Sequence, residues 1–104
     1  MVEDLPIGVI IHQDGKIVFT NPISLNLLKA KQPDQVIGKS VFEFVHPDYK
    51  QIVIDRIKGS LDNKTKQDII EEVFLTVDGE NIYVNAIAMP MHFNGKPAVM
   101  VVAI

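Results

Sequence analysis

The three histidines are the side chains in this sequence best suited to binding a metal or moving a proton. His12, His46 and His92 are far apart, and none has a second histidine four residues away, the spacing that places two ligands on one helix face. His46 is followed directly by Pro47, which marks a helix boundary. We therefore expect no metal site, and we expect each histidine to be either a surface residue or one with a satisfied hydrogen bond.

Other catalytic groups are scarce. Cysteine is absent, which excludes thiol nucleophiles, cysteine-ligated zinc and iron–sulfur clusters. Glu71 and Glu72 are adjacent, but neighbours on a strand point to opposite faces, so we expect at least one of them to be solvated. Ser24 forms no recognisable triad with the histidines. The sequence predicts no catalytic residues, and a small enzyme is the least favoured function.

Length and composition place these groups in a single globular domain. The chain has 104 residues, 47% hydrophobic and 22% charged, so we expect one domain over residues 1–104. The net charge of −3 gives no electrostatic footprint for nucleic acid or an anionic membrane. The longest apolar run, residues 98–104, is too short for membrane insertion. Without cysteine or a visible signal peptide, the expected location is the cytoplasm.

Three turn signals organise the strands. Asp14-Gly15, Asp78-Gly79 and Asn94-Gly95 are each flanked by apolar, β-rich stretches, a pattern that favours two-residue type I′ turns. They predict three antiparallel hairpins, joining residues 7–13 to 16–20, 69–77 to 80–92, and that last strand to 96–104. Pro90 falls within the long strand and donates no ladder hydrogen bond, so we expect a bulge or an unpaired N–H there.

The middle of the chain carries helix signals instead. Asn21 followed by proline predicts a capped helix start, and Ser40 can cap a second short helix. Apolar residues at steps of three and four predict a longer helix over residues 47–61. Gly38 is expected in a left-handed turn. Helices in mid-chain with strands at both ends predict the α+β class with an antiparallel sheet.

This ordered set of motifs resembles the PAS domain family. The resemblance covers nearly the whole chain and is carried by residues 14–22 with their Asn-Pro helix entry, Val36-Ile37-Gly38-Lys39, Val45-His46-Pro47-Asp48, and the turns Asp78-Gly79 and Asn94-Gly95. It implies a five-stranded antiparallel sheet of order 2-1-5-4-3 with helices on one face, in agreement with the strands and helices predicted above.

The resemblance also implies a function. PAS domains are usually sensory or dimerising modules of larger signalling proteins, often bacterial sensor histidine kinases, and continue through an Asp-Ile-Thr motif into a signalling helix. This sequence stops at Ile104, before such a motif, and so looks like an excised module whose partner is an output domain. Two hypotheses stay open. The module binds a small ligand or relays a conformational signal, or it is a ligand-free dimerisation and protein-interaction module.

The resemblance also bears on cofactors. Haem-binding PAS domains use a histidine within the long helix, but that place falls near Ile54 and Asp55 here, and His46 lies only at the helix entry. We therefore expect His46 to be a capping or loop residue and expect no haem. Covalent flavin is not expected either, because light-sensing members need a cysteine. An unidentified small-molecule ligand is compatible with the sequence.

The family's ligand cavity lies between the sheet and the long helix. Strand alternation places small alanines of the long strand toward that helix, which would leave room for a ligand. The candidate pocket residues are Val18, Thr20, Leu28, Phe44, Val53, Ile57, Phe74, Val84, Ala86, Ala88 and Val101. The alternative is that these side chains simply fill the core, because cavities in a small domain cost stability.

The later strands lack the polar alternation of a sheet with one wet face. Residues 73–77 and 99–104 place apolar groups on both faces. We therefore expect the face away from the helices to be covered, and we expect a homodimer there. The candidate residues for this dimer face are Leu75, Val77, Tyr83 and Ile87.

Overall fold

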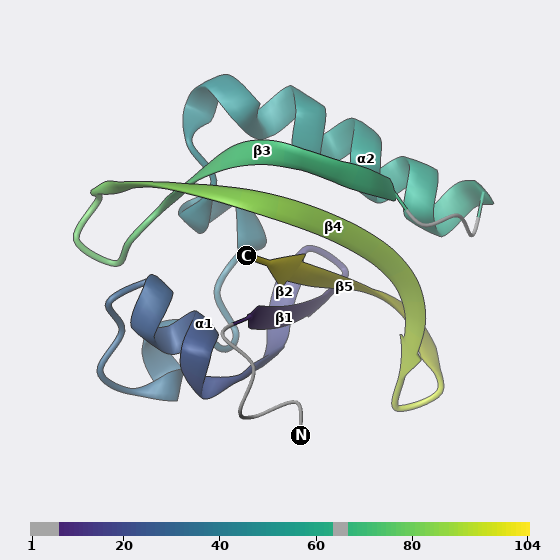
Figure 1. The fold of residues 1–104 in the computed structure, drawn as a ribbon. Coiled ribbons are helices and arrows are strands. Elements are labelled where there is room, and N and C mark those ends of the chain that lie inside the picture. The colour runs from purple at the N-terminus through teal and green to yellow at the C-terminus, as the bar shows by residue number, and fades with distance from the viewer. Residues whose placement is uncertain (1–6, 64–66) are drawn as a thin grey trace.

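Five antiparallel strands form one curved sheet that runs through the molecule (Figure 1). The structure, a computed structural model, describes residues 7–63 and 67–104. The strands are β1 (Gly8–Gln13), β2 (Lys16–Thr20), β3 (Gln67–Leu75), β4 (Asn81–Phe93) and β5 (Lys96–Ala103). Their order is β2-β1-β5-β4-β3, which confirms the predicted α+β fold and its sheet.

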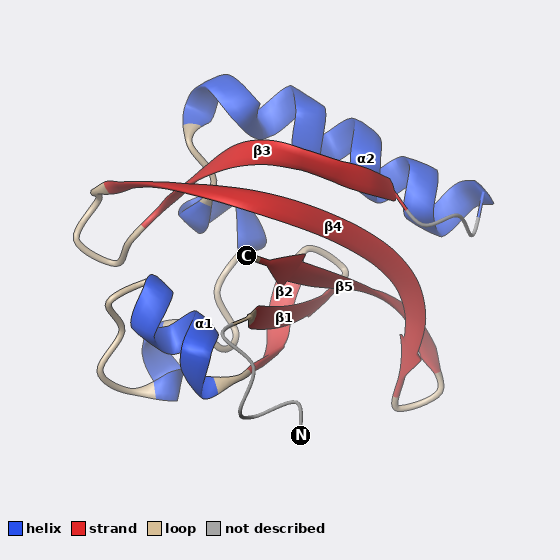
Figure 2. Cartoon of the chain, viewed as in Figure 1, coloured by secondary structure: helices blue, strands red, loops and turns tan. Residues whose placement is uncertain are grey.

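The helices all lie between β2 and β3 in the chain and are blue in Figure 2. They are α1 (Pro22–Leu27), α2 (Lys50–Asn63) and three short 3₁₀ helices, Pro33–Gln35, Val41–Phe44 and Pro47–Tyr49. α1 packs against β1, whereas α2 packs against β3, β4 and β5. The predicted long helix over residues 47–61 is thus a 3₁₀ turn that leads into an α-helix ending two residues later.

The predicted helix caps are confirmed. The Asn21 side-chain oxygen accepts hydrogen bonds from the backbone N–H groups of Ser24 and Val9, both at 2.9 Å. One asparagine therefore caps α1 and joins it to β1. Ser40 caps the 3₁₀ helix Val41–Phe44 in a reciprocal capping box with Glu43.

Two of the three predicted type I′ turns are confirmed. Both residues of Asp14-Gly15 have positive φ, 54° and 80°, as do those of Asn94-Gly95, 51° and 80°. At the third turn only Gly79 has positive φ, 84°, so the prediction of a two-residue turn is wrong. The β3–β4 hairpin closes instead with a wider loop, in which the Thr76 N–H donates to the Glu80 carbonyl at 2.9 Å. The Thr76 hydroxyl stabilises this loop because it accepts the N–H groups of Asp78 and Glu80, at 3.2 and 3.0 Å.

The bulge expected at Pro90 is absent. β4 and β5 pair without a register shift through Pro90, which lies opposite Val99. Within the described residues, the last β3–β4 pair is Gln67 with Ala88, so none of these pairs needs the N–H that Pro90 lacks. The register shifts occur elsewhere, between Ile11 and His12 on β1 and between residues 67 and 70 on β3.

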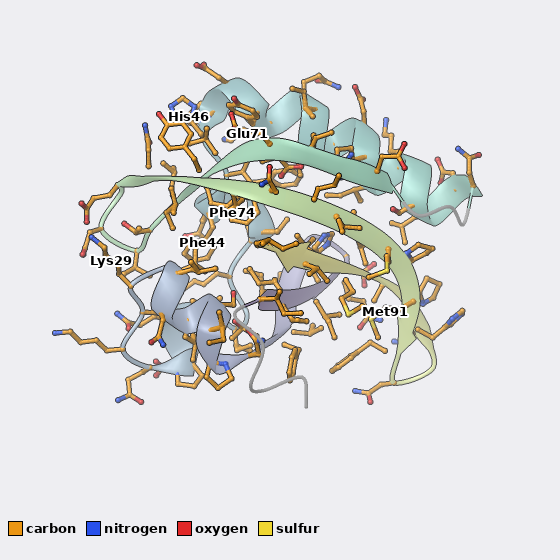
Figure 3. The ribbon with its side chains drawn as sticks, viewed as in Figure 1. Lys29, Phe44, His46, Glu71, Phe74 and Met91 are labelled. Atoms are coloured by element: carbon orange, nitrogen blue, oxygen red, sulfur yellow. The ribbon has the colours of Figure 1, made fainter. Side chains whose placement is uncertain are left out.

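Two buried apolar clusters form the core. The first joins β1 and β2 to the helical segment and contains Ile10, Ile17, Leu28, Val36, Val41 and Phe44. The second lies on the helix-facing side of β3, β4 and β5 and contains Phe74, Val84, Ala86 and Ala103. Figure 3 shows Phe44 and Phe74, one from each cluster, in the middle of the molecule. The candidate site lies where the clusters meet α2.

Candidate ligand cavity

A small cavity lies between α2 and the helix-facing side of the sheet. Its open space is about 40 Å³, and a buried water needs roughly 10–15 Å³ on a comparable scale, so there is room for about three waters. Most of the wall is apolar. The lining residues are Ile10, His12, Ile17, Val41, Phe44, Val45, Val53, Arg56, Ile57, Glu72, Phe74, Ala86, Ile87, Ala88, Val99 and Val101.

One wall of the cavity carries a buried ion pair. Arg56 Nε on α2 lies 3.3 Å from Glu72 Oε2 on β3, with side-chain exposures of 12% and 6%. Arg56 Nη2 also donates to the Ala86 carbonyl on β4 at 3.2 Å. Burial raises the pKa of the Glu72 carboxyl, and the nearby Arg56 charge partly opposes that rise. One arginine therefore connects α2 with two strands at the cavity wall.

His12 forms part of another wall. Its exposure is 3%, and burial lowers the pKa of its imidazole to about 4, so the ring is neutral near pH 7. Within residues 7–63 and 67–104, no protein group forms a hydrogen bond with the ring. His12 is therefore not a surface residue, so that part of the expectation is wrong. The reason is its position on β1, the strand next to the central one, where alternate residues face the core.

An outer groove adjoins the cavity. It has about 250 Å³ of open space between α2, the β1–β2 turn and β5, and its wall includes Asp14, Leu61 and Pro97. His12, Ile57 and Val99 line both the groove and the cavity. These three side chains therefore stand between the interior space and the outer groove.

Most of the pocket residues expected from the sequence lie on the cavity wall. They are Phe44, Val53, Ile57, Phe74, Ala86, Ala88 and Val101. Leu28 and Val84 are buried in the two core clusters but do not line the cavity. Val18 and Thr20 do not line it either. For Val18 the reason is the register shift between β1 and β2, which pairs Ile11 with Phe19 and His12 with Ile17, so that Ile17 rather than Val18 faces the cavity.

Sequence reasoning missed the polar side chains of the wall. Signals for two of them were available. Arg56 follows Val53 by three residues and precedes Ile57, so it shares the buried side of α2. Glu72 alternates with Phe74 on the inward side of β3. Glu71 is exposed on the opposite face, as the alternation predicted for the pair.

The residues expected at a dimer face are only partly brought together. Tyr83, 68% exposed, lies opposite Val73 on the face away from α2, and Leu75 follows on the same face of β3. Ile87 pairs with Val102 but also contributes to the cavity wall. Val77 lies in the loop beyond β3, where it packs against the first core cluster and its N–H donates to the Leu28 carbonyl at 2.9 Å.

His46 caps the 3₁₀ helix Pro47–Tyr49. Its Nδ1 accepts the Asp48 backbone N–H at 3.1 Å, so of the capping and loop positions expected for it, His46 has the capping one. Figure 3 shows it at the periphery, and it is not part of the cavity wall. In the described part of the chain, no cluster of three or more histidine, aspartate or glutamate side chains could hold a metal. None of the described helices is long and apolar enough to cross a membrane.

The strand order, the helices packed on one face of the sheet and the internal cavity together define a PAS fold. The family model described as "PAS domain" matches residues 6–104, so the chain belongs to the PAS domain family. It is 33% identical over all 104 residues to Sporulation kinase A of Bacillus subtilis (strain 168), of which it spans 17% of the length.

Solved structures share the fold at low sequence identity. The PAS domain of nitrogen regulation protein NR(II) from Vibrio parahaemolyticus superposes with a TM-score of 0.79, at 14% identity, covering 98% of this chain and 91% of that one. A PAS domain from Colwellia psychrerythraea gives a TM-score of 0.77 at 18% identity, covering 96% and 86%. These similarities establish the fold. The relative named Sporulation kinase A shows that the chain is also homologous to a segment of a kinase.

Proposed function

We propose that this chain is the sensory module of a larger signalling protein. It binds a small molecule in the cavity, or relays a conformational signal through it, to an output domain. The observation that carries the proposal is the bridge by which Arg56 joins α2 to Glu72 on β3 and to the Ala86 carbonyl on β4. A molecule entering the cavity contacts this bridge, so its binding energy acts on the packing between helix and sheet.

The sheet offers a route for that signal to leave the domain. Val99 and Val101 of β5 line the cavity, and the same strand pairs with β1 so that Ala103 lies opposite Gly8. A change at the cavity therefore acts on two strands whose outer ends lie side by side. A ligand shifts this arrangement only if it binds two packing states with different affinity.

We propose a histidine kinase as the output domain and the cytoplasm as the location. Support for the kinase comes from the relative named Sporulation kinase A. The chain spans only 17% of that relative's length, so the kinase activity would belong to the rest of the parent protein. The lack of cysteine favours the reducing cytoplasm.

A second candidate function is homodimerisation through the face away from α2, with or without a ligand. Because Val101 lines the cavity, its neighbours Met100 and Val102 point to the opposite face. Ile11 on β1 and Met89 on β4 each lie directly opposite Met100, so the three residues form one row across that face. Together with exposed Tyr83, these rows give the face an apolar character suited to a second copy of the chain.

A cavity-filling substitution tests the sensory proposal in the full protein that contains this chain. Ala88→Val adds volume at the cavity wall, and Lys58→Val makes a change on exposed α2 surface as the control. We expect Ala88→Val to lock the output at one level whereas Lys58→Val leaves signalling intact, with circular dichroism confirming that both fold. Unchanged signalling in a folded Ala88→Val protein would refute the proposal. Native mass spectrometry of freshly purified protein detects a retained ligand directly.

A further inference from the structure

The charges at the cavity wall compensate one another. Arg56 and Glu72 form a close pair at 3.3 Å, and His12, with its pKa lowered to about 4, is neutral near pH 7. Among the residues described, no other charged side chain lines the cavity. A ligand that enters therefore meets hydrogen-bonding groups but no net charge.

The hydrogen-bonding capacity of this wall is not used up. A guanidinium has five N–H donors, and within the described residues Arg56 makes two contacts, to Glu72 and to the Ala86 carbonyl. The carboxylate of Glu72 has two oxygens, and its contact with Arg56 uses Oε2. Donors and acceptors thus lie next to each other at an otherwise apolar wall. A group that both accepts and donates a hydrogen bond matches this arrangement.

A carboxylate ligand matches it poorly. It could accept from Arg56 but would bring its own negative charge beside buried Glu72, whose pKa is already raised by burial. Burying an additional charge without a partner is costly. The limited space also disfavours a charged ligand, because about 40 Å³ leaves little room for water to accompany an ion.

From this geometry we infer that the cavity selects small neutral molecules of about three to five non-hydrogen atoms, with an apolar body and one group that both donates and accepts a hydrogen bond, such as a short alcohol or amide. The inference rests on the proposed sensory function and specifies its ligand class. The apolar body packs against Val53, Ile57 and Ala88, and the polar group lies at the Arg56–Glu72 pair. The outer groove lined by His12 and Leu61 is the route of entry.

The test compares isosteric probes. Propanamide and propanoate have nearly the same shape and differ in charge, and 1-propanol is a second neutral probe. Each is titrated into ¹⁵N-labelled protein at about pH 8, where propanoate is ionised and His12 is neutral. We expect the neutral probes to shift the amide signals of Ala86, Ala88 and Val101 with dissociation constants of about 1–10 mM, since so few atoms bind weakly. Propanoate should bind at least about tenfold more weakly.

Variants of the pair then reverse or remove the preference. Glu72→Gln leaves the Arg56 charge uncompensated, so propanoate should bind it more tightly than propanamide does. The double variant Arg56→Met with Glu72→Met should not distinguish the two probes. If Glu72→Gln does not fold, the comparison of probes on the unaltered protein still decides the proposal.

The outcomes separate the ligand class from the proposed function. Equal or tighter binding of propanoate to the unaltered protein would overturn the neutral-ligand inference and leave ligand sensing in place. If none of the probes shifts the cavity signals, the ligand class is also overturned. In that case the Ala88→Val experiment on the full protein decides the sensory function independently.

Discussion

Arg56 Nε and Glu72 Oε2 lie 3.3 Å apart in the interior and join α2 to β3. The two residues belong to different elements, because Arg56 lies on α2 and Glu72 lies on β3, an edge strand of the sheet. Their contact therefore depends on how the helix packs on the sheet. Both ions have left water, so each depends on the other for compensation. The pair therefore affects stability and helix position at the same time.

Removing one member of the pair should be far more damaging than removing both. We expect Arg56→Met to lower the free energy of unfolding by about 3–5 kcal/mol, because it leaves a buried carboxylate without its partner. The double variant Arg56→Met with Glu72→Met should regain most of that loss, since an apolar pair of similar volume often matches or exceeds a buried ion pair. Urea denaturation of the three proteins measures the difference.

An exposed ion pair is the matched control. Lys29 Nζ lies 2.8 Å from Glu80 Oε1, with side-chain exposures of 55% and 57%. Lys29→Met should leave the urea midpoint unchanged, because water screens exposed pairs. Similar costs for Arg56→Met and Lys29→Met would show that burial of the Arg56–Glu72 pair has no energetic consequence.

Burial of His12 should make the protein sensitive to mild acid. Its pKa is lowered from 6.5 to about 4, so the unfolded chain binds a proton that the folded chain does not bind between those values. Stability is therefore full above pH 6.5 and falls as the pH decreases toward 4, by about 3 kcal/mol in all. His12→Gln removes the titrating ring, so its free energy of unfolding should fall less steeply in this window. Urea midpoints across the window give the slope.

The exposed His92 provides the control for this titration, and His92→Gln should keep the slope of the unaltered protein. Glu72 acts in the opposite sense. Its pKa is raised in the folded chain, so at pH values between the usual and the raised pKa the folded chain binds more protons than the unfolded chain does. The free energy of unfolding therefore increases as the pH falls through the raised pKa. Glu72→Gln should therefore make the acid loss steeper. An unchanged slope in His12→Gln would refute the linkage.

The loop between β3 and β4 should depend on Gly79. Its φ of 84° lies in the left-handed region, and a Cβ there would meet open space, so backbone strain is the only cost of adding one. We expect Gly79→Ala to destabilise the protein by about 1–2 kcal/mol. Gly79→Asn should cost less, because asparagine tolerates left-handed φ. Thermal melts of both variants check this order, and equal costs would contradict it.

The sequence predicted the fold better than the details of the cavity. Turn dipeptides and caps act locally, so Asn21, Ser40 and two of the three Gly turns could be assigned from neighbouring residues alone. The cavity wall depends on long-range register. The shift beside His12 on β1 changes which β2 residues face inward, and no local signal marked it. The Arg56–Glu72 pair depends likewise on how α2 lies across β3, although the position of each residue on its buried face could be read from periodicity.

The face away from α2 leads to the last prediction. Tyr83 is 68% exposed, and Met100 points to the same face from central β5. If two copies of the chain pair through this face, the protein should sediment at high concentration with about twice the monomer mass of 11.6 kDa. Tyr83→Glu with Met100→Glu should return it to the monomer, because each charge would be buried without a partner at the interface. Ile87 is left intact because it also lines the cavity.

A second double variant separates the position of the new charges from their number. Asn26→Glu on α1 and Ile52→Glu on α2 add the same two negative charges to exposed helix surface away from this face. This variant should stay dimeric, so that only the position of the charges explains the difference. A monomeric unaltered protein at high concentration would refute the interface. So would a folded Tyr83→Glu, Met100→Glu variant that stays dimeric, because two buried carboxylates on each copy leave no apolar contact able to hold this face together.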